Sequence, residues 1–175
     1  MEKLKLVIPN EKYLDDVEAY KEEFLAINSS MDGCGPLRYY DAKEWLEEIK
    51  KYTKKETLPE GKVIATQFLF VRESDNRIIG LIQVRHYFSE YLRLYGGNIG
   101  YSIRPSERRK GYAKEMLKMV LPFCKEIGLE KVLITCLEEN EASRRTILAN
   151  GGVYENTVYD KDQNEHLQRY WITLK

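Results

Sequence analysis

The chain of 175 residues has the length of one domain with a sizeable hydrophobic core. Hydrophobic residues make up 43% and charged residues 32%, which excludes a disordered polar chain. The 28 basic and 28 acidic side chains balance to a formal net charge of zero, which argues against a dedicated nucleic-acid-binding protein, because such proteins carry a basic excess.

Cysteine usage and hydropathy narrow the class further. Cys34, Cys124 and Cys136 lack metal-type spacing, and the two histidines lie far apart, which argues against a zinc site or a disulfide framework. The N-terminus lacks a signal-peptide pattern, and no apolar run reaches membrane-spanning length. We therefore expect a cytoplasmic protein with a single domain over residues 1–175, without a metal and without membrane or nucleic-acid partners.

The first half of the chain predicts one strand, two helices and a hairpin. Residues 4–8 form a short β-like run ended by a proline, and residues 28–40 are rich in turn formers. Two amphipathic helices are predicted from apolar residues at helical spacing: Tyr13, Val17, Tyr20 and Phe24 in the first, and Trp45, Leu46, Ile49 and Tyr52 in the second. The apolar runs 63–74 and 77–88, separated by Asp-Asn, predict a β-hairpin.

The second half predicts four more strands and two more helices. Residues 89–97 are rich in turn formers and lead to a strand at 99–103. The longest helix follows Gly111, with an apolar stripe: Ala113, Met116, Leu117, Val120, Leu121, Cys124 and Ile127. The fully apolar strand 131–137 is expected at the centre of a sheet. A short helix should end at Gly151 and Gly152 in a left-handed cap, and an antiparallel pair should close the chain.

The start of the longest helix combines a glycine with three basic residues, Arg108, Arg109 and Lys110. The first N–H groups of a helix have no intrahelical partners, and the helix dipole adds positive charge there. Gly111 lets a ligand approach the backbone closely, so this segment is a candidate phosphate site. The alternative reading is a solvated helix entry. Neither a Walker P-loop nor a dinucleotide fingerprint is present.

The pattern Arg108-x-x-Gly111-x-Ala113 resembles the pyrophosphate signature of the GNAT superfamily of acyl-CoA-dependent N-acyltransferases. The later pair Asn140-x-x-Ser143 resembles the family element beside the pantetheine arm, although Asn140 also suits a helix N-cap. The segment 147–156 resembles the ending of the branch related to ribosomal-protein N-acetyltransferases. Within the superfamily, the segments 80–92 and 100–113 resemble predicted bacterial acetyltransferases of unassigned substrate.

This resemblance implies an α/β (α+β) protein with the GNAT fold: a central mixed, mostly antiparallel twisted sheet of about seven strands, flanked by about four helices. It implies an N-acetyltransferase that uses acetyl-CoA as co-substrate, acting as a monomer or homodimer. The implied cofactor-binding residues are Ile103, Arg108, Arg109, Lys110, Gly111, Tyr112, Ala113, Asn140 and Ser143. In the family, a backbone N–H in the Ile103 region meets the thioester.

Two positions depart from the family pattern. Ile147 stands where many members have a tyrosine that protonates the leaving thiolate, and Asn98 stands where the related branch often has a glutamate base. The candidate bases here are His86, whose ordinary pKa suits the role, and Glu90, with a water relay as a third route.

The acceptor amine is expected over the segments 29–40 and 86–92, where Asp32 and Glu90 would suit a cationic or polar amine. The competing interpretation is a GNAT-fold protein that binds acyl-CoA without efficient catalysis, as a sensor or regulatory subunit. Binding of RNA or phosphopeptide at the basic residues is disfavoured by the neutral net charge.

Overall fold

The computed structural model describes residues 2–175 and contains seven strands and four α-helices. The strands are β1 Leu4–Val7, β2 Ala65–Arg72, β3 Arg77–Arg85, β4 Ile99–Ile103, β5 Lys131–Leu137, β6 Val153–Asp160 and β7 Glu165–Thr173. The helices are α1 Leu14–Ala26, α2 Ala42–Lys50, α3 Tyr112–Glu126 and α4 Glu141–Ala149. The predicted order and types of these elements are confirmed.

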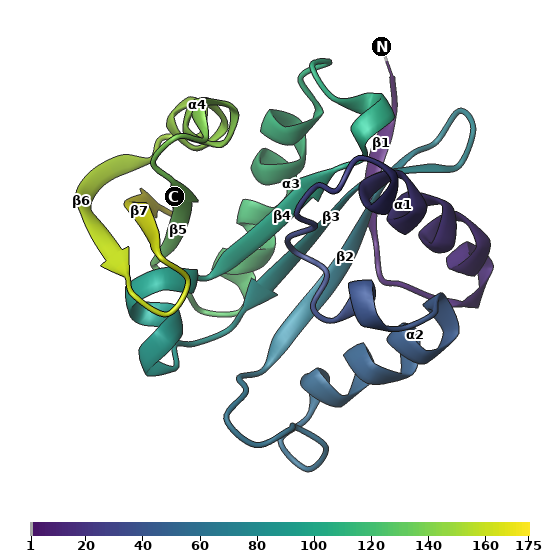
Figure 1. Ribbon diagram of the computed structural model, residues 1–175, viewed down its shortest axis with the longest axis horizontal. Coiled ribbons are helices and arrows are strands. Elements are labelled where there is room, and N and C mark those ends of the chain that lie inside the picture. Colours follow the sequence, from purple (N-terminus) through teal and green to yellow (C-terminus); the bar gives the residue numbers. More distant parts are fainter. Residues whose placement is uncertain (1) are drawn as a thin grey trace.

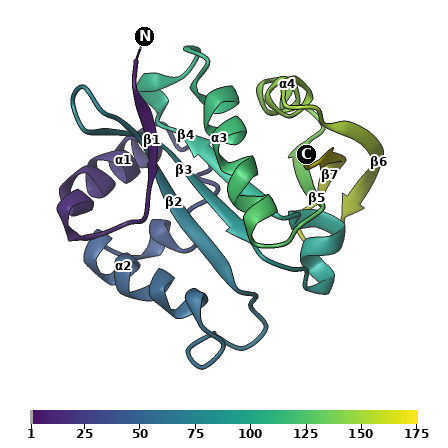
Figure 2. The ribbon, with the colours of Figure 1, turned by 180° about the vertical axis from the view of Figure 1, so that it is seen from behind.

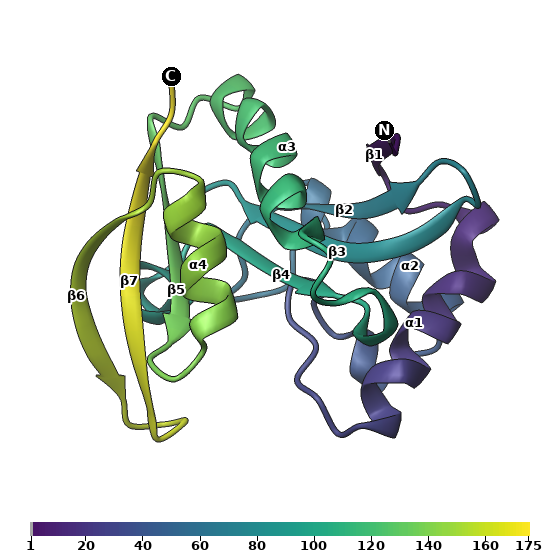
Figure 3. The same ribbon diagram turned by 90° about the horizontal axis from the view of Figure 1, so that it is seen from above.

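The strands form two antiparallel sheets rather than one continuous sheet. The first has the order β1-β2-β3-β4 and the second has the order β5-β7-β6. Figure 3 shows the two sheets opening away from each other, with β4 and β5 as the neighbouring strands. The expectation that residues 131–137 lie at the centre of a sheet is therefore wrong, because β5 is the edge strand of the second sheet.

Helices cover both faces of the first sheet. α1 and α2 lie on one face and α3 lies on the other (Figures 1 and 2). The predicted apolar stripes are mostly buried. Tyr20, Phe24 and Trp45 belong to the core between the sheet and α1 and α2, and Met116, Leu117 and Val120 belong to the core between the sheet and α3. Period-2 alternation along β3 sends Leu81 to the α1 side and Ile82 to the α3 side.

Two local features concern the segment 89–97 and the end of α4. The segment 89–97, predicted as turn-rich, contains a wide helical turn at Leu92–Gly96. The left-handed cap after α4 is confirmed, since Gly151 has a φ of 86°. Within residues 2–175, no helix is both long and apolar enough to cross a membrane.

Candidate functional site

The N-terminus of α3 presents a run of unpaired backbone donors. Among residues 2–175, the backbone N–H groups of residues 109–114 have no acceptor, and no side chain caps the helix. α2 and α4 differ, because Asp41 and Asn140 cap their first turns. Six consecutive free donors at the positive end of a 15-residue helix form a site for an anion.

The backbone of this loop depends on two left-handed residues. Arg109 has a φ of 64° and Gly111 a φ of 82°. A Cβ built on Gly111 would meet no atom within 4 Å, so the glycine is required by its backbone conformation rather than by crowding. The open space above Gly111 leaves the free N–H groups accessible to a ligand.

The three basic side chains point in different directions. Arg108 turns toward the end of α1, where its Nη2 donates to Ser29 Oγ at 3.2 Å. Lys110 Nζ lies 3.0 Å from a carboxylate oxygen of Glu107, while Arg109 is exposed. The structure therefore places these residues in one loop without converging their side chains, and the backbone donors left free in this loop, among the described residues, are the N–H groups of residues 109–114.

Glu107 ties this loop to the hairpin β2–β3. Its buried carboxylate accepts from Arg72 Nη1 at 3.0 Å and from Arg77 Nε at 3.2 Å. Burial raises the pKa of Glu107, but hydrogen bonds from Lys110 and Arg72 outweigh it and hold the pKa below its ordinary value. The ionised carboxylate thus positions the chain just before the free N–H groups.

Tyr112 and Ala113 contribute backbone rather than side chains to this site. The Tyr112 ring is buried and its hydroxyl donates to Glu2 Oε2 at 2.6 Å, so the side chain points away from the free donors. Ala113 is half-buried in the first turn of α3.

β4 has one edge that is free along most of its length. Two residues flanking β4 bond to β3: the carbonyl of Asn98 accepts from Arg85 N, and Arg104 N donates to Ile79 O. Alternate residues of an antiparallel strand bond to the same neighbour, so the N–H groups of Ile99, Tyr101 and Ile103 point to the opposite edge, toward β5. Within the described chain these three groups have no acceptor. The Ile103 N–H predicted to meet the thioester therefore faces the gap between the sheets.

Asn98 closes that gap at one end. Its backbone N–H donates to Leu133 O at 2.7 Å, and its side-chain Oδ1 accepts from Leu133 N at 2.9 Å. Its Nδ2 donates to Arg85 O at 3.1 Å. The residue at the family's glutamate position therefore acts here as a clamp between the two sheets, and both polar atoms of its side chain take part.

Tyr101 bridges the gap between β4 and α4. Its hydroxyl lies 2.8 Å from Ser143 Oγ, in the first turn of α4, where Asn140 Oδ1 accepts from Ser143 N at 3.1 Å. Burial raises the pKa of Tyr101 to about 12, against the lowering effect of the Ser143 hydrogen bond. Ile147 is fully buried. Sequence reasoning did not single out Tyr101. The available signal was its place in β4 between Ile99 and Ile103, whose side chains lie on the same face of the strand.

The two predicted bases lie apart. His86 shares the α3 side of the sheet with Val84: its Nε2 is 2.8 Å from Thr66 Oγ1, and its ring packs edge-on against Phe123 of α3. Burial lowers the pKa of His86. Glu90 is exposed in the following segment. No hydrogen bond or ion pair joins His86 to Glu90 among residues 2–175, and each has different surroundings.

A cavity of about 530 Å³ lies beside the loop between α1 and α2. Its lining residues are Asn28, Ser29, Ser30, Met31, Asp32, Gly35, Arg38, Tyr39 and Gln163. The loop is held in place at Gly33, whose carbonyl accepts from Gln67 Nε2 at 2.7 Å. A Cβ on Gly33 would lie 2.4 Å from Gly100 O, so this loop rests directly on the backbone of β4.

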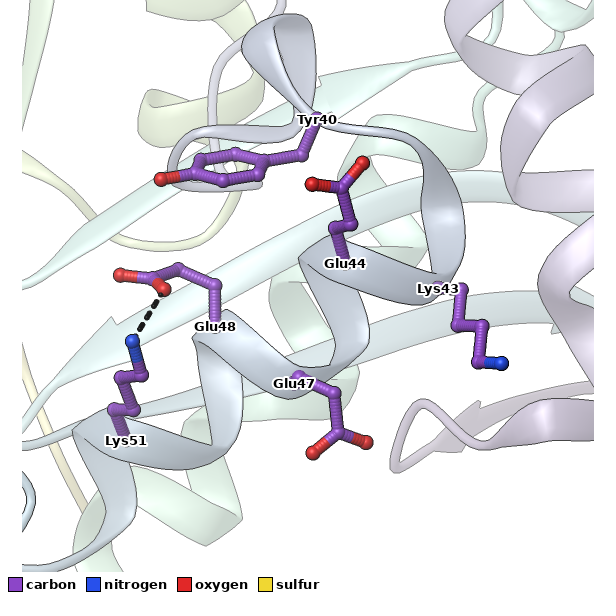
Figure 4. Close-up of a pocket in the computed structure, with 6 residues that line it drawn as sticks. All are labelled: Tyr40, Lys43, Glu44, Glu47, Glu48 and Lys51. Carbon is purple, nitrogen blue, oxygen red and sulfur yellow. Dashed lines mark hydrogen bonds and ion pairs between the residues drawn. The ribbon is translucent and has the colours of Figure 1, made fainter.

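A second concave region, of about 360 Å³, lies on the outer side of α2 (Figure 4). Its lining residues are Tyr40, Lys43, Glu44, Glu47, Glu48 and Lys51. Glu48 and Lys51 pair at 2.9 Å, and all six residues belong to α2 or its flanks. Its charges are those of a solvated helix surface, and we do not assign it to the site.

Residues 11–153 match the family model of the acetyltransferase (GNAT) domain. The chain therefore belongs to the GNAT family and is an N-acetyltransferase, as the sequence motifs predicted. It is 26% identical over 131 residues to the uncharacterized N-acetyltransferase YnaD of Bacillus subtilis (strain 168), covering 63% of this chain and 74% of YnaD.

Solved structures share the fold. The ribosomal-protein-S5-alanine acetyltransferase of Vibrio fischeri superposes with a TM-score of 0.76 at 14% identity, covering 100% of this chain and 95% of that one. RimL, a ribosomal L7/L12 alpha-N-protein acetyltransferase solved with coenzyme A, gives a TM-score of 0.71 at 16% identity, covering 98% and 94%. The predicted GNAT fold is confirmed.

Proposed function

We propose that this protein transfers an acetyl group from acetyl-CoA to the amine of a small molecule or peptide, by direct attack in a ternary complex. The observation that carries the proposal is the uncapped N-terminus of α3, where residues 109–114 offer free backbone N–H groups to a pyrophosphate. The GNAT relative solved with coenzyme A supports the choice of cofactor.

The remaining cofactor contacts would follow the gap between the sheets. The pyrophosphate would lie on Gly111, Tyr112 and Ala113, with Arg108, Arg109 and Lys110 supplying positive charge. The pantetheine arm would run along the free edge of β4 toward Ile103. Asn140 and Ser143 would flank that arm from α4, because Ser143 already reaches β4 through Tyr101.

The cysteines of this chain favour direct attack by the amine over an acyl-enzyme intermediate. Cys34, Cys124 and Cys136 are buried, and burial raises their thiol pKa to about 12, 12 and 11. None is a ready nucleophile for an acyl-enzyme. The amine nitrogen would attack the thioester carbonyl, the Ile103 N–H would stabilise the developing oxyanion, and the carbon–sulfur bond would break.

Two protons must leave the amine nitrogen, one before attack and one from the tetrahedral intermediate, and one proton must reach the departing thiolate. A lysine-like amine has a pKa of about 10.4 and must lose a proton before attack. His86 and Glu90 remain the predicted general bases that would take a proton from the amine. Replacement of His86 by Gln should remove the acidic limb of the pH profile of kcat/KM, and an unchanged profile would exclude His86 as the base.

The departing thiolate would take its proton from the Tyr101–Ser143 hydroxyl pair, which would take over the role of the tyrosine absent at Ile147.

Thermal unfolding with acetyl-CoA, CoA or ATP tests the cofactor. A ligand at about a hundred times its dissociation constant stabilises the folded state by roughly 2.7 kcal/mol. For a chain of this length that corresponds to about 5–10 °C in the midpoint. We expect the rise with both CoA species and not with ATP, and no rise with either CoA species would refute the proposal. Thiol release with an amine then separates an enzyme from a non-catalytic CoA-binding protein.

A further inference from the structure

The cavity beside the α1–α2 loop holds one carboxylate and a nearby pair of arginines that do not pair with it. Asp32 and Arg38 line the cavity. Arg85 does not line the cavity but lies next to it: a Cβ on Gly100 would meet Arg85 Nη2 at 3.0 Å and the backbone N of Gly33, the neighbour of Asp32, at 3.4 Å. Within residues 2–175 no ion pair joins Asp32 to either arginine. Charges of both signs are therefore available to a ligand.

Most other arginines with restricted exposure have carboxylate partners. Arg72 and Arg77 hold Glu107, Arg104 holds Asp16, and Arg169 holds Glu155. Such pairing is the usual requirement for a charge withdrawn from water. Arg85 and Arg38 depart from this rule, so the chain leaves two cations near one cavity without neutralising them.

Arg85 is held only by uncharged acceptors. Its Nε donates to Gln83 Oε1 at 3.2 Å and its Nη1 to Gly96 O at 3.0 Å, while Nη2 has no acceptor within the described chain. Burial lowers the pKa of Arg85, opposed by the charge of Asp32. An arginine nevertheless stays protonated at neutral pH, so the charge persists.

The alternation along β3 puts Arg85 on the cavity side of the sheet. Val84 and His86 face α3, so Gln83 and Arg85 face the α1–α2 loop. A Cβ on Gly35, which lines the cavity, would lie 3.7 Å from Gln83 Nε2.

Arg38, which belongs to the loop between α1 and α2, also has free N–H donors. Its Nη2 donates to Ser29 O at 2.6 Å, and its remaining N–H groups have no acceptor within residues 2–175. Arg38 is half-buried, and its bond to Ser29 O ties one end of the guanidinium to the loop. A planar carboxylate matches such a donor set.

Asp32 supplies the opposite charge. It is exposed, yet the concave surface around it removes water and raises the pKa of its carboxyl, against the lowering effect of Arg85 and Arg38. No described residue donates a hydrogen bond to this carboxylate. Gly33, its neighbour, rests on Gly100 of β4, so an ammonium held by Asp32 would lie beside the strand whose free edge is proposed to receive the thioester.

We propose that the acceptor is an amino acid or a related small amine bearing a carboxylate, with its ammonium group at Asp32 and its carboxylate at Arg38 and Arg85. This rests on the proposed acetyl transfer and names the class of acceptor. Arg38 and Asp32 line the cavity and Arg85 lies beside it, so the local charge is net positive and disfavours a polyamine, because the excess positive charge repels a polycation.

Binding of matched pairs tests the proposal directly. Calorimetry on the CoA-saturated protein would compare L-lysine with cadaverine, L-methionine with 3-(methylthio)propylamine, and L-phenylalanine with phenethylamine. Each pair differs only by the carboxylate. We expect at least one amino acid to bind at least tenfold more tightly than its decarboxylated partner, and spermidine to bind more weakly than L-lysine.

Arg38→Gln tests the role of the cavity cation in binding a carboxylate, because it removes the charge and leaves a polar side chain in its place. It should reduce the preference for the carboxylate to within about threefold, while affinity for the decarboxylated amine changes little. Arg145→Gln, an exposed arginine on α4 outside the cavity, is the matched control and should keep the preference.

The outcomes separate this inference from the proposed function. Equal affinities, a preference for the decarboxylated amines, or no measurable binding of any pair would overturn the inference. Thiol release with decarboxylated amines alone would also overturn it and leave acetyl transfer standing. A persistent carboxylate preference without thiol release from acetyl-CoA would support the cavity as a site for amino acids and count against the transferase proposal.

Discussion

At the scale of single residues, Gly111 is the position on which cofactor binding depends most directly. We predict that Gly111→Asp abolishes the thermal shift with acetyl-CoA, because a carboxylate would stand among donors arranged for a pyrophosphate. The fold should persist, since a Cβ there meets no atom within 4 Å and a non-glycine residue at positive φ costs about 1–2 kcal/mol. Gly111→Asn adds the same bulk without charge and should weaken binding less. A retained shift in Gly111→Asp would contradict the site.

Tyr101 carries the second prediction at this scale. Tyr101→Phe removes the hydroxyl that lies 2.8 Å from Ser143 Oγ and should lower kcat by about tenfold or more, with little change in affinity for CoA. The effect should be moderate, because a thiolate with a pKa of about 8.5 is already a good leaving group. Steady-state kinetics and CoA titration measure the two quantities. Unchanged kcat would exclude Tyr101 as the proton donor.

At the scale of elements, the loop before α3 is held by the ion pairs of Glu107. Glu107→Gln should lower the free energy of unfolding by about 2–3 kcal/mol, because Arg72 and Arg77 lose a buried partner. Asp75→Asn, which removes an exposed partner of the same Arg72, is the matched control and should cost about 0–1 kcal/mol. Urea unfolding at pH 7 measures both variants.

The pH dependence of this network has a definite sign. Because the pKa of Glu107 is lower in the folded state, its stabilising contribution is complete above its ordinary value of 4.5 and is lost as the pH falls through the folded-state pKa. The difference in stability between the wild type and Glu107→Gln should therefore be full at pH 7 and shrink below about pH 4.5. A difference that grows on acidification would contradict this account.

At the scale of the whole molecule, Asn98 sets how the two sheets meet. Asn98→Ala leaves Leu133 N and Arg85 O without their side-chain partner in a buried place, which should cost about 1–3 kcal/mol of stability. It should also weaken CoA binding, because the clamp closes one end of the gap proposed for the pantetheine arm. Denaturant unfolding and CoA titration would check the two effects, and full retention of both would show that the clamp is dispensable.

The elements and their order could be read from local patterns. The helical spacing of Tyr20 and Phe24 marks α1 because burial repeats with the helical period. The Arg108-x-x-Gly111-x-Ala113 pattern pointed to the start of α3 because it directly precedes the apolar stripe of the helix in the chain. The central placement expected for residues 131–137 failed for a physical reason: β5 is buried by helices and by the neighbouring sheet without being paired on both edges.

What the sequence by itself determined about this protein is therefore its family, its elements and the segment that meets the cofactor, because these depend on residues close together in the chain. Only the tertiary structure decided that Asn98 joins the two sheets, that Tyr101 reaches Ser143, and that His86 faces α3. It also decided which arginines have carboxylate partners. Such contacts join residues tens of positions apart, and only the packing of strands against helices brings them together.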